Sequence, residues 1–148
     1  MELLERNEFL QLLRNGFRKT LSGEGHCFFV MGEAGIGKSS LVRSFLKEVE
    51  GKCQVVTALC DSLFTPRPLG ILYDFAPQID PTLTGKMGST TLRAELFTDV
   101  AQALTRYNEP VVLVIEDTHW ADEASLDFIK FFARRISATG CMFILTYR

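Results

Sequence analysis

The chain has 148 residues, of which 47% are hydrophobic, and a formal net charge of −2. This length is typical of a single domain. The slight negative charge argues against a nucleic-acid-binding surface, and no apolar run approaches the roughly 18 residues that a membrane helix needs. Because the N-terminus mixes acidic and basic residues with leucines, it does not resemble a secretory signal. We therefore expect one cytoplasmic domain, residues 1–148, without a membrane span.

Four cysteines lie in or beside apolar, strand-like runs: Cys27, Cys53, Cys60 and Cys141. No two of them form a C-x-x-C pair, and a metal site would need closer ligand spacing. We expect buried, reduced thiols.

The first half of the chain alternates helical and strand patterns. Hydrophobic residues at three- and four-residue spacing predict a helix over 3–21. A strand is expected over 27–31, a helix over 38–49 and a β-branched strand over 54–60. The residues expected on the buried helix faces are Leu3, Leu4, Phe9, Leu10, Leu13, Phe17 and Leu21, followed by Leu41, Val42, Phe45, Leu46 and Val49.

The middle of the chain is rich in proline and glycine. A short helix is expected over about 69–76 and a loop over 77–90. A helix over about 91–107, capped by Ser89 or Thr90, should follow. The buried face of that helix is expected to hold Leu92, Leu96, Val100 and Leu104. Three aromatic residues are expected in the core beneath 61–90 and not as a platform on which a nucleotide stacks: Phe64, Tyr73 and Phe75.

The most continuously apolar stretch, residues 110–115, predicts a strand covered on both faces and therefore central in a parallel sheet. Asp122 is expected to cap a helix over 123–138, and a fourth strand is expected over 141–146. The inner face of that helix should hold Leu126, Ile129, Phe132, Ala133 and Ile136. The alternation of strands and helices predicts an α/β fold, a doubly wound parallel sheet with helices on both faces.

Between the first strand and the second helix lies the pattern G-x-x-x-x-G-K-[ST]. Its residues are Gly32, Glu33, Ala34, Gly35, Ile36, Gly37, Lys38 and Ser39, and Ser40 continues the helix start. Glycines allow successive N–H groups to surround a phosphate, and the helix N-terminus adds donors and a positive dipole. Lys38 can reach the β- and γ-phosphates, and the Ser39 hydroxyl can bind Mg²⁺. A glycine-rich turn with an exposed lysine is the alternative, but the strand and helix flanks favour a phosphate-binding loop.

A carboxylate pair, Glu116 and Asp117, follows the central strand. In open α/β sheets, ligands bind at the carboxyl ends of the strands. Beside a phosphate loop, one carboxylate can hold Mg²⁺ through its water shell and the other can orient a water that attacks the γ-phosphate. The pair could instead begin a turn and cap the next helix, although Asp122 is available for that cap.

These motifs resemble the ATPase module of STAND-class signal-transduction ATPases, an AAA+ related (NACHT/AAA-like) group of P-loop NTPases found in large bacterial transcriptional regulators. The resemblance rests on the phosphate loop, on the strand that ends at Asp117, on Thr118-His119-Trp120-Ala121-Asp122, on Thr146-Tyr147-Arg148 and on the opening Leu4-Glu5-Arg6-Asn7-Glu8-Phe9-Leu10. It covers nearly the whole chain.

The resemblance implies roles for individual residues. It implies that Glu116 occupies the Mg²⁺-associated position and Asp117 the catalytic carboxylate position, with Lys38 on the phosphates. Glu116 departs from the aspartate that is more common there. The resemblance also implies that Thr146 senses the γ-phosphate, that Arg148 contacts it, and that Arg6 lies in a turn near the adenine. The alternative for Thr146 and Arg148 is a polar strand end.

Two neighbouring side chains have more ordinary expected roles. His119 is expected to orient a loop or to pack rather than to catalyse, and Trp120 to anchor the loop after the strand, with partner contact as the alternative.

The resemblance further implies a fifth strand beside the first one and a helical lid, both of which the sequence lacks. We therefore expect a P-loop core over 27–148 that is a fragment of a longer protein, with the first strand as an apolar sheet edge. Implied cofactors are ATP and Mg²⁺. Implied partners are attached effector or sensor domains and nucleotide-dependent self-association.

Three functions remain open from the sequence. The first is a nucleotide-dependent switch with slow ATP hydrolysis, acting in signalling or transcriptional regulation. The second is a small P-loop kinase, disfavoured because residues 61–90 offer only Arg67 and Lys86 for a cationic lid. The third is a degenerate nucleotide-binding interaction module.

Overall fold

All four predicted strands form, and they pair in parallel in the order β1-β4-β3-β2. The computed structural model describes residues 3–32, 37–61, 68–87, 92–106 and 109–148. The strands are β1 (His26–Met31), β2 (Gln54–Leu59), β3 (Val111–Glu116) and β4 (Cys141–Tyr147). The predicted central position of the apolar strand is confirmed, because β3 lies between β4 and β2.

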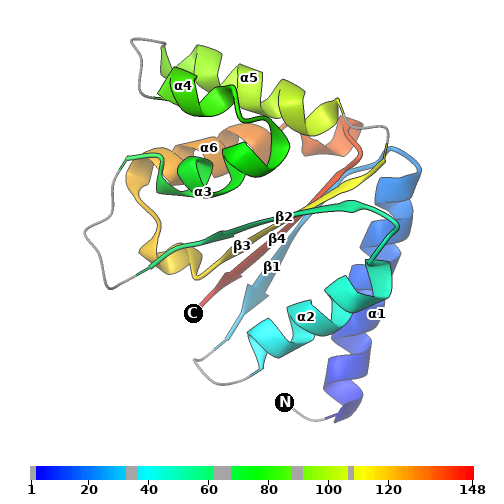
Figure 1. Cartoon of the computed structure of the whole chain (residues 1–148). Coiled ribbons are helices and arrows are strands. Elements are labelled where there is room, and N and C mark those ends of the chain that lie inside the picture. Colours follow the sequence, from blue (N-terminus) through cyan, green and yellow to red (C-terminus); the bar gives the residue numbers. More distant parts are fainter. Residues whose placement is uncertain (1–2, 33–36, 62–67, 88–91, 107–108) are drawn as a thin grey trace.

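Helices cover both faces of the sheet (Figure 1). On one face lie α1 (Leu3–Leu21) and α2 (Lys38–Val49), and on the other lie α3 (Gly70–Ile79), α4 (Leu83–Met87), α5 (Arg93–Thr105) and α6 (Glu123–Ala133). Two short 3₁₀ turns, η1 (Thr118–Trp120) and η2 (Ile136–Ala138), flank α6. The predicted α/β architecture is therefore confirmed.

The alternation of side chains along the two central strands explains why both faces are covered. Successive strand residues point to opposite faces. Val112 and Val114 of β3 pack with α1 and α2, whereas Val111, Leu113 and Ile115 pack with α3, α5 and α6. Because all five are hydrophobic and buried, β3 can be stable only between two helical layers.

The middle of the chain contains more helix than predicted. The α3 helix continues through Pro77 to Ile79, whose side chain packs against the core, and the α4 helix lies inside the predicted loop 77–90. At the other end, α6 is shorter than predicted and stops at Ala133, with η2 following. Burial of Leu83, which is 1% exposed, outweighs the helix-breaking composition around α4.

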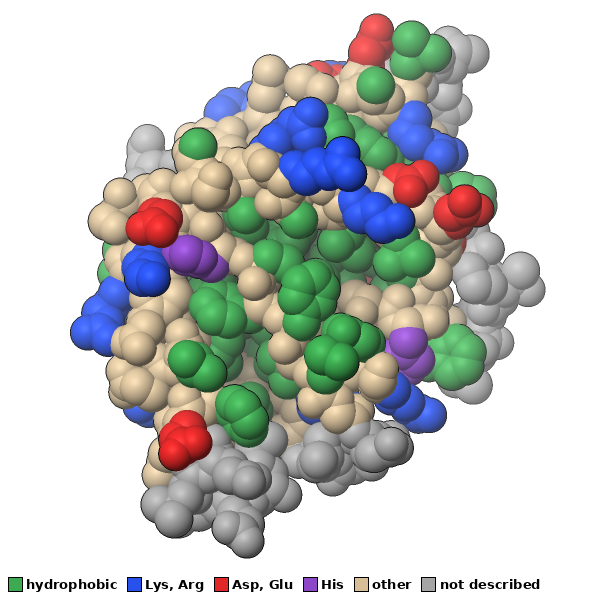
Figure 2. Space-filling model, turned by 180° about the vertical axis from the view of Figure 1, so that it is seen from behind, with side chains coloured by type: hydrophobic (Ala, Val, Ile, Leu, Met, Phe, Trp, Pro, Cys, Tyr) green, Lys and Arg blue, Asp and Glu red, His purple; other side chains and the backbone are tan. Residues whose placement is uncertain are grey.

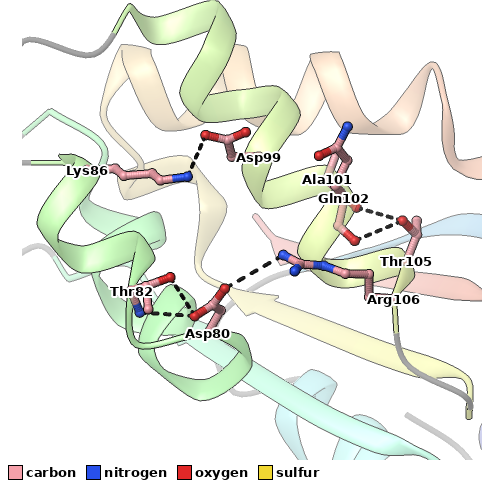
Figure 3. A network of polar contacts seen from close by, with 8 residues as sticks. All are labelled: Asp80, Thr82, Lys86, Asp99, Ala101, Gln102, Thr105 and Arg106. Carbon is pink, nitrogen blue, oxygen red and sulfur yellow. Dashed lines mark hydrogen bonds and ion pairs between the residues drawn. The ribbon is translucent and has the colours of Figure 1, made fainter.

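A polar network fixes the start of α4 and joins it to α5 (Figure 3). The Asp80 carboxylate accepts hydrogen bonds from the Thr82 N–H (3.0 Å) and hydroxyl (2.8 Å), a local turn that the proline-rich composition concealed. These bonds lower the pKa of Asp80 below its ordinary value. Ion pairs link Lys86 to Asp99 (3.0 Å) and Arg106 to Asp80 (3.6 Å), and such exposed pairs contribute little individually.

Several residues predicted in the core are exposed. Because α5 begins only at Arg93, Leu92 lies in the N-cap position and is 67% exposed. The predicted caps Ser89 and Thr90, like Phe64, lie outside the described residues. Other exposed residues that were expected in the core are Phe9, Leu21 and Leu126, while Phe97 and Phe128 are buried although they were not among the expected core residues.

The β1 strand forms one edge of the sheet, with β4 as its only neighbour among the described strands. Its Phe29 and Met31 side chains are 58% and 63% exposed. Hydrophobic side chains gather in a hollow on the side of the molecule that Figure 2 shows. A cavity of about 130 Å³ between β1 and α1 is lined mainly by Phe9, Leu12, Leu13, Phe28 and Phe29. None of the described helices is long and apolar enough to cross a membrane.

Replacing Phe29 and Met31 together with lysine is expected to reduce concentration-dependent association of the chain. An apolar edge strand is a template for pairing with another chain, and charged side chains oppose that pairing. Sedimentation velocity over a concentration series measures the effect. The control is Leu92→Lys, which changes an equally exposed residue outside the sheet. A native chain that stays monomeric over the whole series would contradict this prediction.

Candidate nucleotide-binding site

The predicted phosphate loop joins β1 to α2. Gly32 follows β1 with a φ of 153°, and its N–H donates to the Tyr147 carbonyl at the end of β4 (3.2 Å). Gly37 is the N-cap of α2 with φ 97° and ψ 18°, and its carbonyl accepts the Leu41 N–H (2.9 Å). Both φ values favour glycine, which explains its place at the two ends of the loop. The remaining loop residues, Glu33, Ala34, Gly35 and Ile36, lie outside the described residues.

Lys38 and Ser39 lie in the first turn of α2. The Lys38 side chain is buried, and its ammonium group donates a hydrogen bond to the Gly32 carbonyl. The ammonium group therefore lies between the end of β1 and the start of α2. Ser39 is exposed in the same turn. A cation, a hydroxyl and the positive end of a helix dipole are the groups that a phosphate and its Mg²⁺ require.

Arg6 is part of α1 and not of a turn before it, because the helical pattern extends back to Leu3. Its guanidinium donates to the Ser40 hydroxyl (3.0 Å), to the Ser40 carbonyl (3.1 Å) and to the Ser44 hydroxyl. Arg6 thus ties α1 to the first turns of α2. The expected turn is wrong, and a contact of Arg6 with adenine stays a prediction.

The carboxylate pair lies where the sequence predicted it. Glu116 is the last residue of β3, and Asp117 follows with φ 57°, a left-handed conformation that aspartate adopts more readily than most residues. The Asp117 N–H donates to the Thr146 hydroxyl (3.0 Å), and the Thr118 hydroxyl donates to the Thr146 carbonyl (3.1 Å). The loop after β3 is therefore attached to β4.

Thr146 links the two halves of the site. It lies in β4 opposite Val30 of β1, is 1% exposed, and holds the Asp117 amide on its other side. Because β1, β4 and β3 are parallel, the phosphate loop and the carboxylate pair both follow the carboxyl ends of their strands. The β4 strand lies between β1 and β3, so Thr146 lies between the two motifs. Arg148 follows β4 and is exposed.

The aromatic pair after the carboxylates is not buried. The Trp120 side chain is 44% exposed, and its ring centroid lies 5.3 Å from that of His119. Trp120 is thus partly exposed beside His119, and its role as an anchor for the loop stays a prediction.

The cysteine nearest the carboxylates is Cys60, whose N–H donates to the Glu116 carbonyl (3.0 Å). Burial raises the pKa of the Cys60 thiol to about 12, and the charges of Asp122, Asp74 and Asp117 act in the same direction. Such a thiol is not nucleophilic at neutral pH. All four cysteines are free: Cys60 and Cys141 are buried, and Cys27 and Cys53 partly so.

The fold and these motifs together define the class. An α/β sheet in the order β1-β4-β3-β2, with a glycine-bounded loop before α2 and a carboxylate pair after β3, is a P-loop NTPase fold.

The profile of the AAA ATPase domain family matches residues 2–144, and the chain belongs to that family. A search of curated proteins gave no match.

Solved structures of similar fold include chains of Drosophila ORC bound to AT-rich DNA (TM-score 0.58, 16% identity, 97% of this chain) and of Drosophila ORC bound to DNA (TM-score 0.57, 15% identity, 95% of this chain). This chain spans 48% of the first of those chains and 78% of the second. At these identities, the likeness concerns the fold.

Replacing Thr146 with valine is expected to destabilise the protein by about 1–3 kcal/mol, because the Asp117 N–H loses its acceptor. Chemical denaturation measures the loss, and hydrogen exchange of the Asp117 amide should become faster. Thr146→Ser, which keeps the hydroxyl, is the control and should retain that protection. Unchanged exchange in Thr146→Val would show that the bond does not hold the loop.

The Asp122 carboxylate predicts a pH dependence. Burial alone would raise its pKa, but hydrogen bonds from Ser125, Leu69 and Gly70 outweigh it and lower the pKa. A lowered folded-state pKa stabilises the protein above the unfolded pKa of about 3.9 and loses that effect as the pH falls through the folded value. The stability difference between the native chain and Asp122→Asn should therefore be constant above about pH 5 and shrink below about pH 4. Denaturation curves between pH 3 and pH 7, in steps of about half a unit, test this, and a difference independent of pH would contradict it.

Proposed function

We propose that this chain is the ATP- and Mg²⁺-binding module of a nucleotide-dependent switch in signalling or transcriptional regulation, with slow ATP hydrolysis. The observation that carries the proposal is the placement of the phosphate loop and the Glu116–Asp117 pair on either side of Thr146. The preference for adenine and the STAND-type switch role rest on the resemblance in sequence.

In this proposal the residues divide the work between binding and hydrolysis. Lys38 and the amides at the start of α2 hold the phosphates, since α2 directs its positive end at the loop. The Ser39 hydroxyl and Glu116 would hold Mg²⁺, which would supply charge neutralisation at the phosphates. Asp117 orients the attacking water. Thr146 and Arg148 respond to the γ-phosphate.

The exposed β1 edge is compatible with a partner of this module, either an attached domain or a second copy of the chain. DNA is bound in the named ORC structures, but the net charge of −2 gives no support for nucleic-acid binding by this chain.

The test compares ATP affinity and turnover in the native chain, Lys38→Ala and Asp117→Asn. Lys38→Ala should abolish binding, because the phosphates lose their buried cation, whereas Asp117→Asn should bind normally and lose most turnover. Calorimetry measures binding, and phosphate release measures hydrolysis. Lys47→Ala, at the far end of α2, is the control and should behave as the native chain.

Two outcomes would contradict the proposal. ATP binding that is unaffected by Lys38→Ala would show that the loop is not the binding site. Phosphate transfer to a small acceptor, faster than hydrolysis, would favour a kinase.

A further inference from the structure

The beginnings of α3 and α6 are joined by one side chain. The Asp122 carboxylate is the N-cap of α6 and accepts from the Ser125 N–H (2.8 Å) and hydroxyl (2.6 Å). The same carboxylate accepts the Leu69 N–H (2.8 Å) and the Gly70 N–H (3.0 Å) at the start of α3. Asp122 therefore caps two helices that follow two different strands.

The α3 helix depends on this contact for its start. Its own N-cap residue is Leu69, which has no polar side chain and adopts a left-handed φ of 64°. The Ile71 N–H, which follows those of Leu69 and Gly70, donates to the hydroxyl of the fully buried Ser125 (3.3 Å). Three successive N–H groups at the start of α3, those of Leu69, Gly70 and Ile71, are thus bonded to side chains at the start of α6 that lie more than 50 residues away in the sequence.

The second half of α3 is hydrogen-bonded to β2, on the side of that strand that faces away from β3. The Gln78 side chain donates to the Thr57 carbonyl (2.7 Å) and accepts the Thr57 N–H (3.1 Å), and Asp74 accepts the Leu59 N–H (3.2 Å). The edge of β2 is therefore hydrogen-bonded to α3, so the helix and the strand form one unit.

Residues 117–122 consequently have two supports. Thr146 holds Asp117 and Thr118 at one end, and the start of α3 holds Asp122 at the other. Removal of the second support would leave the loop attached at its first end alone, through the bonds of Asp117 and Thr118 to Thr146. A displacement of about 1 Å is sufficient to slow catalysis strongly.

We propose that Asp122 is a positioning residue, which couples α3 to the loop that carries Asp117 and thereby makes turnover depend on the state of α3. The coupling itself is a property of the loop, and its effect on turnover rests on the proposed ATPase function. A partner that displaces the start of α3 would change the position of Asp117 without contacting nucleotide.

Asp122→Ser separates the two caps. Serine is a good N-cap and can still accept the Ser125 N–H, but it has one oxygen on a shorter side chain and cannot also reach Leu69 and Gly70. Hydrogen exchange at Gly70–Leu72 and at 117–121 should both become faster. With ATP, kcat should fall about ten- to a hundred-fold, while the affinity for ATP should change by less than about two-fold.

Two further variants complete the experiment. Asp127→Ser, an exposed carboxylate on the same helix, is the control and should match the native chain. If Asp122→Ser does not fold, Gly70→Ala replaces it, because the added Cβ would lie 3.3 Å from the Asp122 carboxylate, which must then shift by a few tenths of an ångström. A smaller loss of kcat in the same direction is expected.

The outcomes distinguish the inference from the proposed function. Faster exchange at α3 with native exchange at 117–121 overturns the coupling, whether or not the chain hydrolyses ATP. Faster exchange at both segments with native kcat shows that Asp122 does not position Asp117. A native chain that neither binds nor hydrolyses ATP contradicts the proposed function, and the exchange data still decide the coupling.

Discussion

The arrangement of the site depends on the parallel pairing of β4 with both β1 and β3. The carboxyl ends of parallel strands lie at the same end of a sheet. Pairing with β4 therefore places the phosphate loop after β1 and the carboxylate pair after β3 at the same end. The interior of β4 is hydrophobic except for Thr146 at its end. Thr146 is almost fully buried. In that position the hydrogen bond from the Asp117 N–H to the Thr146 hydroxyl is strongly favoured over leaving either group unpaired.

The two edge strands of the sheet, β2 and β1, differ in what covers their outer sides. The β2 edge is bonded by Asp74 and Gln78 of α3, whose side chains take the N–H and carbonyl groups that an incoming strand would use. Along β1, the exposed groups include Phe29 and Met31, and the neighbouring cavity is apolar. The polar cover over β2 makes it a poor pairing surface, so association of this domain through its sheet is expected at β1.

Much of the fold was predictable from local patterns. The unbroken apolar run at 110–115 required a strand covered on both faces, and the spacing of Gly32, Gly37 and Lys38 required a loop before a helix. The cap at Asp122 was also visible in the sequence. These features depend on residues that are near one another in the chain. The spacing of hydrophobic residues along the chain also distinguishes strands from helices.

What the sequence did not show depends on distant contacts. The helix α4 forms because Leu83 is buried by tertiary packing, while its composition alone indicates a loop. The second role of Asp122 joins residues 52 and 53 positions apart, and such a contact leaves no periodic signal. For Arg6, the resemblance suggested a turn, but the helical periodicity of residues 3–21 was the better guide to local structure.

The two halves of the site share β4, because Gly32 donates to Tyr147 and Asp117 donates to Thr146, but their helical supports differ. Arg6 and the Arg14–Glu48 ion pair (2.6 Å) attach α1 to α2, the helix that carries Lys38. The loop that carries Asp117 is attached, in addition to β4, to the start of α3 through Asp122. In the proposed coupling, a displacement of the start of α3 would reach the carboxylates through Asp122 and not through α1 and α2. In a switch this separation is useful, because nucleotide can remain bound while its hydrolysis is accelerated or slowed from outside the site.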